Sequence, residues 1–443
     1  MQFDTPVRSA FQWLRSSQGI ALLVITITTW TSVSHFYPDN NYRTVVQMDG
    51  DGYYAYLPFV FETQGSTYQT FADYSYQADT IPHFLRSAGN GFVNKYFAGE
   101  AVLLTPFYLT SKLLVHPDPE HPGYSRANLM SVAIGAMFYF AIGILLFRRF
   151  LRSYGFSEPV ISTLLIGLTF GTNLWWYVAR EPSMSHVYSF FLVCSLLLLF
   201  QEYAAGKRGV RPILLFACAG LLALTRPTDA LIALFIPLFL NRSHLILLAR
   251  NWLGWLILIC VVSIQPILYF IQCGEWAVWS YADEGFNFSD PYLWSTWFSW
   301  LKGLGIYFPF LLLVFPGFYF FWKKKRKVPS FWLIAGLFVV FYILSSWHAW
   351  HYGWSFGMRA YIQFYPLLLL SIGYLIEAAM GHLSTRLVLG VFIIYALLHT
   401  FSAAQIASID YGFIQNITQE DWSQLLFRDE DEIRQTIKET KVR

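Results

Sequence analysis

The chain has 443 residues, of which 56% are hydrophobic and only 13% are charged. Soluble domains have about 45–50% apolar and about 25% charged residues, so this composition is typical of a membrane protein. The net charge of +3 is too small to indicate a nucleic-acid partner, and the four cysteines show no metal-ligand spacing and are expected to be buried, inert thiols.

Apolar runs near the length of a bilayer crossing predict membrane-spanning helices. Arg8 and Arg15 precede the first run without a clear cleavage site after it, which predicts an uncleaved anchor. The runs 211–225 and 230–241 are short, and the sequence RPTD between them predicts either a tight pair of spans or one broken helix. The runs lie at about 18–37, 126–147, 158–178, 183–202, 211–225, 230–241, 252–271, 304–322, 329–346, 361–379 and 386–404.

Basic clusters decide the expected topology, because Lys and Arg mark cytoplasmic loops. The clusters RRFLR (148–152) and KKKRK (323–327) fall on the same side as Arg8 and Arg15 only if 94–117 is an interfacial or re-entrant helix. We therefore expect an all-α polytopic membrane protein with about eleven spans, in a range of about 10–13. Its N-terminus would be cytoplasmic.

The expected domain organisation is one transmembrane domain, residues 1–404, followed by a polar tail, 405–443. A long first outer loop at 38–125 would hold interfacial helices. The tail sequence RDEDEIRQTIKETK predicts a charged surface helix with ion pairs four residues apart.

Polar residues near membrane depth are costly and usually functional. With this topology they gather on the outer side of the membrane. The set comprises Asp49, Asp51, Lys95, Glu100, Arg126, Arg180, Glu181, Ser183, Ser185, His186, Arg226, Asp229, His348, His351 and Arg359.

An acidic pair stands in the stretch QMDGDGYYAYLPFVF, residues 47–61. Asp49 and Asp51 could share a divalent cation, or one could be a general base while the other orients it or raises its pKa. Glycines beside Asp51 allow a tight turn near a substrate, and Tyr53 and Tyr54 offer flat amphipathic surface to a sugar ring. The alternative is an acidic turn that only ends a helix.

Basic side chains of the outer loops have two interpretations. The planar charged fork of Arg359, between a glycine and an apolar run, suits a phosphate group. Arg180 is either a second phosphate contact or an interfacial anchor. His348 and His351 have HxxH spacing, which would bind metal on a helix, although their aromatic surroundings favour an interfacial role.

The order of these motifs resembles the GT-C superfamily of integral-membrane glycosyltransferases, which includes protein O-mannosyltransferases and the aminoarabinose transferase of lipid A. The resemblance covers most of residues 1–380. It rests on Asp49 and Asp51 with YYAYLP, then NKYFAGEAVLLTPF, then YSRANLMSVAIGA led by Arg126, and on Glu181 in REPSMSHVYSFFLV. Many relatives have adjacent acids, whereas this chain has Asp-Gly-Asp.

The resemblance implies an inverting glycosyltransferase of the bacterial inner membrane with a periplasmic active site. The implied donor is a sugar on undecaprenyl phosphate, or dolichyl phosphate in a eukaryote, and the acceptor is a glycan, lipid or protein. No cofactor is required, although Asp49 and Asp51 could hold Mg²⁺ or Mn²⁺. The implied roles are Asp51 as base with Asp49; Arg359, Lys95, Arg226 and Arg180 at the donor phosphate; and Tyr53, Tyr54, Glu181, His186, His348 and His351 at the substrates.

Three alternatives belong to other classes. A transporter or lipid flippase would also have many spans, but we find no paired inverted halves, and the polar set lies at one surface. A surface-polysaccharide polymerase or ligase would share the donor but usually lacks an acidic pair after its first span. A structural scaffold would not need these acids and Arg359 on one face.

Glycine-rich phosphate loops are absent from the sequence, so ATP is not expected as an energy source.

Overall fold

A computed structural model describes residues 16–38, 41–62, 82–114, 122–207, 211–324 and 327–442. Helices dominate these residues, and the strands found there form one two-stranded sheet. The expected all-α fold is therefore confirmed. Arg8 and Arg15, used to orient the N-terminus, lie outside the described residues.

Seven helices in the described residues are long and apolar enough to cross a membrane. Three further apolar helices are shorter: Glu158–Phe170, Pro212–Thr225 and Pro227–Phe239. All ten coincide with predicted apolar runs, as expected for a multi-pass membrane protein. The seven long ones are Ser17–Phe36, Arg126–Ser153, His186–Ala204, Trp252–Cys273, Val328–Ser345, Arg359–Ala379 and Leu383–Ile409.

The chain forms two compact units. The first, here called the loop unit, comprises Ile25–Leu146 and Tyr177–Gly285. The second, here called the C-terminal unit, comprises Met1–Val24, Phe147–Trp176 and Phe286–Arg443. Helices α2 (Ser17–Phe36), α6 (Arg126–Ser153) and α8 (Leu174–Ala179) contribute residues to both.

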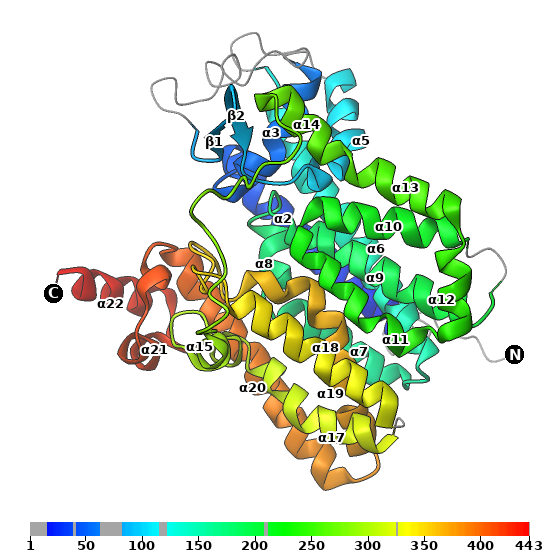
Figure 1. The fold of residues 1–443 in the computed structure, drawn as a ribbon. Helices are drawn as coiled ribbons and strands as arrows, with labels where there is room; N and C mark the ends of the chain where they lie inside the picture. The colour runs from blue at the N-terminus through cyan, green and yellow to red at the C-terminus, as the bar shows by residue number, and fades with distance from the viewer. Residues whose placement is uncertain are drawn as a thin grey trace, which may run out of the picture. The chain divides into compact units, whose positions relative to one another are not determined.

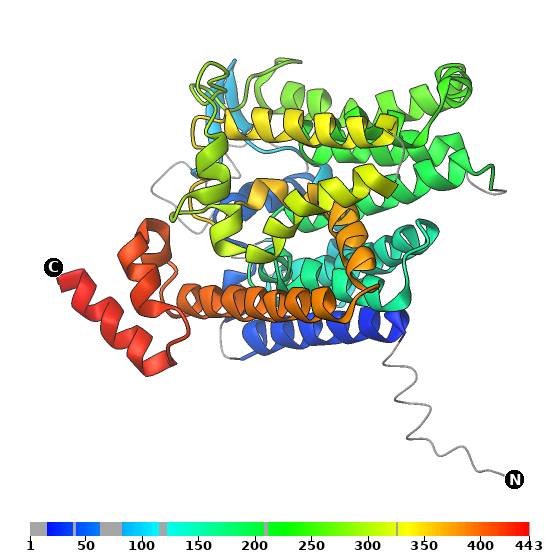
Figure 2. The same cartoon turned by 90° about the horizontal axis from the view of Figure 1, so that it is seen from below.

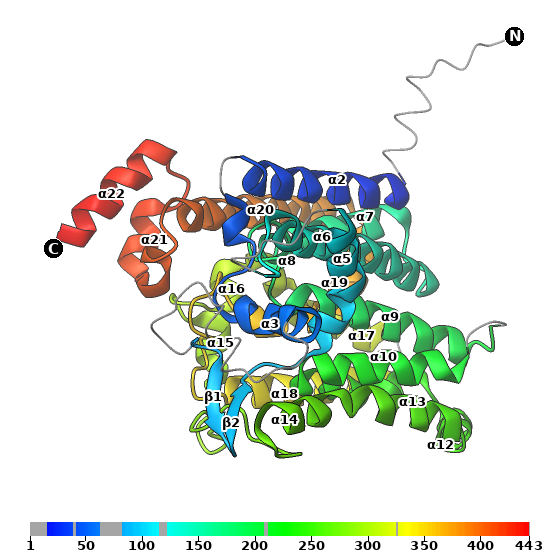
Figure 3. The same cartoon turned by 90° about the horizontal axis from the view of Figure 1, so that it is seen from above.

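The loop unit holds the acidic pair. Helix α10 packs against both α9 and α13, and these helices run side by side (Figures 1 and 3). The hairpin of β1 and β2 packs against α14, and α3 packs against α5. The elements are η1 (Asn41–Thr44), α3 (Asp49–Phe61), β1 (Leu85–Ala88), β2 (Gly91–Asn94), α5 (Gly99–Leu114), α9 (His186–Ala204), α10 (Pro212–Thr225), η2 (Pro227–Phe235), α11 (Ile236–Phe239), α12 (Arg242–Ala249), α13 (Trp252–Val262) and α14 (Ile264–Cys273).

The helical structure of the two short apolar runs is interrupted between them. Helix α10 ends at Thr225, and Arg226 takes an extended conformation with φ −152° and ψ 120°. Pro227 explains this break, since the residue before a proline is disfavoured in the α conformation. The structure thus contains the break on which both alternatives, a tight pair of spans and one broken helix, depend.

The C-terminal unit is built around α19, which packs against α17 and α7 and is buried along most of its length. Its elements are α7 (Glu158–Phe170), α15 (Leu293–Phe298), α16 (Leu304–Tyr307), η3 (Pro309–Leu313), α17 (Val314–Lys324), α18 (Lys327–Ser345), η4 (Arg359–Phe364), α19 (Tyr365–Ala379), α20 (Leu383–Ile409), η5 (Phe413–Asn416), α21 (Gln419–Leu425) and α22 (Glu430–Val442).

The tail helix α22, red in Figure 2, follows α20 and α21 and packs against both. Arg434 pairs with Glu430 four residues earlier at 2.6 Å, as the charge pattern predicts. Its other face buries Ile433 and Ile437. The tail is therefore an amphipathic helix docked on this unit.

Candidate functional site

The acidic pair lies in the first turn of α3 rather than in a free turn. Met48, just before the helix, has a left-handed φ of 54°. Its carbonyl accepts a hydrogen bond from His83 Nε2 at 2.8 Å. Asp49 and Asp51 are two residues apart, and such positions do not face each other on a helix. This geometry does not favour one cation held by both carboxylates.

Gly50 and Gly52 allow two segments to approach α3 closely. A Cβ on Gly50 would lie 1.9 Å from Ser183 Oγ, and one on Gly52 would lie 2.2 Å from Tyr96 Cδ2. Both separations are far below van der Waals contact. The glycines predicted from the sequence to make a tight turn therefore serve close packing inside a helix.

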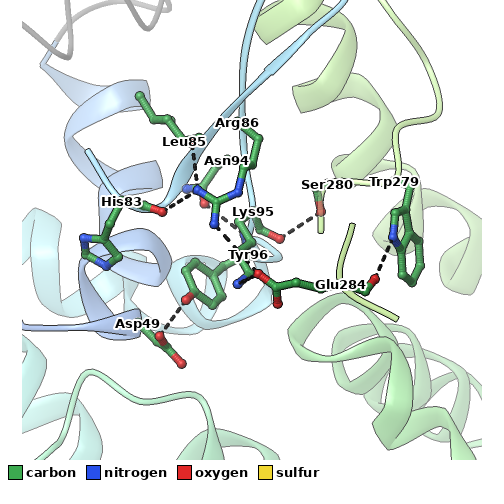
Figure 4. Close-up of polar contacts among 10 residues, drawn as sticks. All are labelled: Asp49, His83, Leu85, Arg86, Asn94, Lys95, Tyr96, Trp279, Ser280 and Glu284. Carbon is green, nitrogen blue, oxygen red and sulfur yellow. Dashed lines mark hydrogen bonds and ion pairs between the residues drawn. The ribbon is translucent and has the colours of Figure 1, made fainter. Parts of the chain in front are cut away.

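Asp49 faces a group of tyrosines. The Tyr96 hydroxyl donates to Asp49 Oδ1 at 2.6 Å (Figure 4). Tyr53 follows Asp49 by one helical turn, and its ring centroid lies 4.7 Å from that of Tyr96. Burial, and then the neighbouring Asp49 carboxylate, raise the pKa of Tyr96, so its hydroxyl stays a hydrogen-bond donor.

Asp51 is half-buried, and its pKa rises from 3.8 to about 6. Burial is the main cause, and the nearby Asp49 carboxylate adds to it, while His83 acts in the opposite direction. A carboxylate with a pKa near the working pH is suited to general-base catalysis. His83 was not among the site residues predicted from the sequence, because no recognisable motif links it to the acidic pair.

Lys95 belongs to an ion-pair network that joins the hairpin to the loop after α14 (Figure 4). Its Nζ lies 2.5 Å from Glu284 Oε1, and Arg86 lies 3.8 Å from the same oxygen. The Lys95 ammonium also lies 5.0 Å from the ring centroid of Tyr281. Ser280 Oγ donates to the Lys95 carbonyl at 2.8 Å. The predicted phosphate ligand Lys95 is thus paired with an acid that the sequence motifs did not identify.

Arg226 and His186 meet where α10 ends and α9 begins. Arg226 Nη1 lies 2.7 Å from His186 Nδ1. The Tyr53 phenol lies within electrostatic range of Arg226, Glu100 and Asp49. Two predicted phosphate and substrate ligands are therefore brought to the tyrosine side of α3.

Arg180 and Glu181 lie in the same unit. Arg180 Nη1 contacts His35 Nδ1 at 2.6 Å, close to the end of α2. Glu181 is buried.

Tyr54, predicted to contact the substrate, is engaged in packing contacts. Its hydroxyl donates to the Gly123 carbonyl, and its ring centroid lies 5.4 Å from that of Tyr124. These contacts are those of a packing residue.

The remaining predicted site residues belong to the C-terminal unit. Arg359 is buried at the start of η4. His348 and His351 lie in a run of turns, so the helical geometry on which an HxxH metal site depends is not formed. Within the described ranges, no group of three or more His, Cys, Asp or Glu side chains could hold a metal ion.

No protein-family model matches the chain, and no curated protein matches it significantly. The GT-C resemblance therefore stays an expectation from the sequence.

Proposed function

We propose that the protein is a membrane glycosyltransferase that moves a sugar from a polyprenyl-phosphate donor to an acceptor hydroxyl on the outer face of the membrane. The observation that carries the proposal is Asp51, a half-buried carboxylate with a pKa of about 6 in the first turn of α3. Asp49 and Tyr53 lie on the same helix, and Tyr96 donates a hydrogen bond to Asp49. The aromatic rings offer flat amphipathic surface to a sugar, and a carboxylate with such a pKa suits general-base catalysis.

In this reaction Asp51 takes the proton of the acceptor hydroxyl. The acceptor oxygen attacks the anomeric carbon, and the bond from that carbon to the phosphate oxygen breaks. The lipid phosphate leaves with the bonding electrons, so the anomeric configuration is inverted. Positive charge stabilises the leaving group. Arg226 and Lys95 supply such charge in the loop unit. To do so, Lys95 releases its ion pair with Glu284 and pairs with the donor phosphate instead.

The donor would be a sugar on undecaprenyl phosphate, or on dolichyl phosphate in a eukaryote, and the acceptor a glycan, lipid or protein. The reaction does not require a metal, because arginine and lysine can neutralise the same charge as Mg²⁺ or Mn²⁺. Full transfer after chelation would support this, and loss of transfer restored by either ion would contradict it.

The direct test is a transfer assay with purified protein in lipid nanodiscs. Radiolabelled undecaprenyl-phosphate sugars would be supplied with cell-envelope acceptors, and the product anomer would be determined by NMR. We expect transfer with inversion and its loss in Asp51→Asn. A protein that transfers none of the sugars, or one whose Asp51→Asn variant is fully active, would contradict the assignment.

The proposed orientation places about eleven spans in a bacterial inner membrane, with the N-terminus cytoplasmic and the site periplasmic. It depends on 94–117 not crossing the membrane. Helix α5 covers part of this segment with 16 residues, fewer than the roughly 20 that span a bilayer. Cysteines placed at Asn90 and Tyr124 should both react with an impermeant thiol reagent from outside. Reaction from opposite sides would show that 94–117 crosses the membrane, and every later loop would then lie on the side opposite to the one proposed.

A further inference from the structure

Glu100 is a buried acid that forms no hydrogen bond through its side chain with the described part of the chain. It is fully enclosed in the first turn of α5, and neither carboxyl oxygen accepts a hydrogen bond from the described residues. An isolated charged carboxylate is very costly to bury, so such a group takes up a proton instead. Burial indeed raises the pKa of Glu100 well above its usual range. A protonated carboxyl offers one O–H donor and one carbonyl acceptor.

Close packing holds Glu100 beside the candidate site. A Cβ on the preceding Gly99 would lie 2.3 Å from the backbone nitrogen of Thr225, so the start of α5 touches the end of α10. The next residue after Thr225 is Arg226. Both Glu100 and Arg226 act electrostatically on the Tyr53 phenol. Glu100 therefore faces the tyrosine side of α3 and not an unrelated part of the unit.

Ser183 is a second buried polar group of this kind. Its hydroxyl is fully enclosed and makes no hydrogen bond with the described residues. It lies against Gly50, three positions before Tyr53, and positions three apart are neighbours on a helix surface. Two polar groups with unused hydrogen-bonding capacity thus border one face of α3. Buried polar groups are normally satisfied, so each such group needs an explanation.

We propose that Glu100 and Ser183 bind hydroxyl groups of the transferred sugar, with Glu100 in its protonated form. This rests on the proposed function and adds the residues that select the sugar. A neutral carboxyl suits the position for two reasons. It both donates to and accepts from a sugar hydroxyl, and it does not repel the phosphate of the donor. A site built to bond a hydroxyl strongly rejects the analogue that lacks it, because the site's polar groups are left unpaired.

The competing explanation is an ordered water that satisfies both side chains. A water would make them contributors to stability without any influence on the choice of sugar. The two explanations differ in how variants respond to deoxygenated substrates.

The first measurement compares Glu100→Gln, Glu100→Leu and Ser183→Ala on farnesyl-phosphate esters of glucose, mannose, galactose and arabinose, and on monodeoxy forms of the best donor. Glutamine keeps a donor and an acceptor, so Glu100→Gln should stay within roughly tenfold of wild-type kcat/KM. The kcat/KM of Glu100→Leu should fall roughly 10- to 100-fold with the intact sugar. It should hardly fall with the monodeoxy sugar that lacks the hydroxyl bound by Glu100. Equal losses on all sugars would overturn the proposal in favour of water.

The second measurement reads protonation without requiring transfer. The infrared difference spectrum between wild type and Glu100→Gln at pH 8 should show the carbonyl stretch of a protonated acid. The matched control is Glu202→Gln, because Glu202 is also buried but pairs with Lys207 at 3.1 Å, and it should show no such band. Methyl glycosides of the same four sugars, added as probes, should shift the Glu100 band.

The two proposals can fail separately. If wild type transfers none of the sugars but the band is present and shifts with a methyl glycoside, Glu100 binds a sugar hydroxyl and the transferase assignment is wrong. If transfer occurs but the band is absent, the proposal for Glu100 is wrong. If Glu100→Leu fails to fold, the infrared difference spectrum of Glu100→Gln still decides whether protonated Glu100 binds a sugar hydroxyl.

Discussion

Asp51→Asn should make the protein more stable while abolishing transfer. Asparagine has nearly the same size as aspartate but carries no charge that burial can disfavour. The pKa of Asp51 rises from 3.8 to about 6 on folding. A tenfold change in proton affinity corresponds to about 1.4 kcal/mol, so the charged form costs the folded state up to about 3 kcal/mol. Because Asp51 is only half-buried, solvent screening reduces this, and we expect about 1–2 kcal/mol.

The sign of the pH dependence follows from the raised pKa. Below pH 3.8 Asp51 is protonated in both the folded and the unfolded state, and its charge costs nothing. Between pH 3.8 and about 6 the unfolded state releases its proton first, so folding becomes progressively less favourable. Above pH 6 the full cost is present. The stabilisation of Asp51→Asn should therefore be largest at pH 8 and should disappear near pH 4.

Thermal unfolding in nanodiscs at pH 8 and pH 4, alongside the pH profile of transfer, would measure both effects. The wild-type kcat/KM should fall on the acid side with a midpoint near pH 6. Asp49→Asn is the matched control. It weakens the hydrogen bond that Asp49 accepts from Tyr96, so it should lower stability at pH 8. An Asp51→Asn protein that is no more stable than wild type at pH 8, or equally stabilised at both pH values, would refute the reasoning.

Three further outcomes are expected. Gly50→Ala should lower the unfolding free energy by roughly 1–3 kcal/mol despite the better helix propensity of alanine, because its Cβ would lie 1.9 Å from Ser183 Oγ; an unchanged melting temperature would contradict this. Glu284→Gln should lower the donor KM and Lys95→Met should raise it, because Glu284 pairs with Lys95 at 2.5 Å; identical donor KM values would remove Lys95 from donor binding. Arg359→Ala should reduce donor use by about one to two decades, and Arg359→Lys should restore only part of it; full rescue by lysine would indicate a simple anchor.

The helices could be predicted because spanning length and apolar composition are local properties of the chain. The predicted start near residue 126 and the break at RPTD both agree with the structure. The run 304–322 was less well predicted. It divides into α16, η3 and α17, because Pro309 opens a new element that the apolar composition does not reveal.

The site was predicted only in part. Asp49 and Asp51 were found from their spacing, and their electrostatic coupling agrees with the expectation that one acid raises the pKa of the other. Their helical setting was not foreseen, because glycine is a poor helix former and two glycines in four residues favour a turn. Partners such as His83 and Glu284 come from distant segments, and no local pattern marks them. Arg359 belongs to the other unit and remains a prediction from the sequence.

The alternation of acids and glycines explains the raised pKa of Asp51. The amino end of a helix favours an ionised carboxylate, and by itself it would keep the pKa of Asp51 low. Burial of that first turn outweighs this effect. The burial depends on Gly50 and Gly52, since any side chain there would push Ser183 and Tyr96 away and admit water. A carboxylate at position 50 would displace Ser183. The spacing Asp-Gly-Asp is therefore tied to the packing of the loop that carries Ser183.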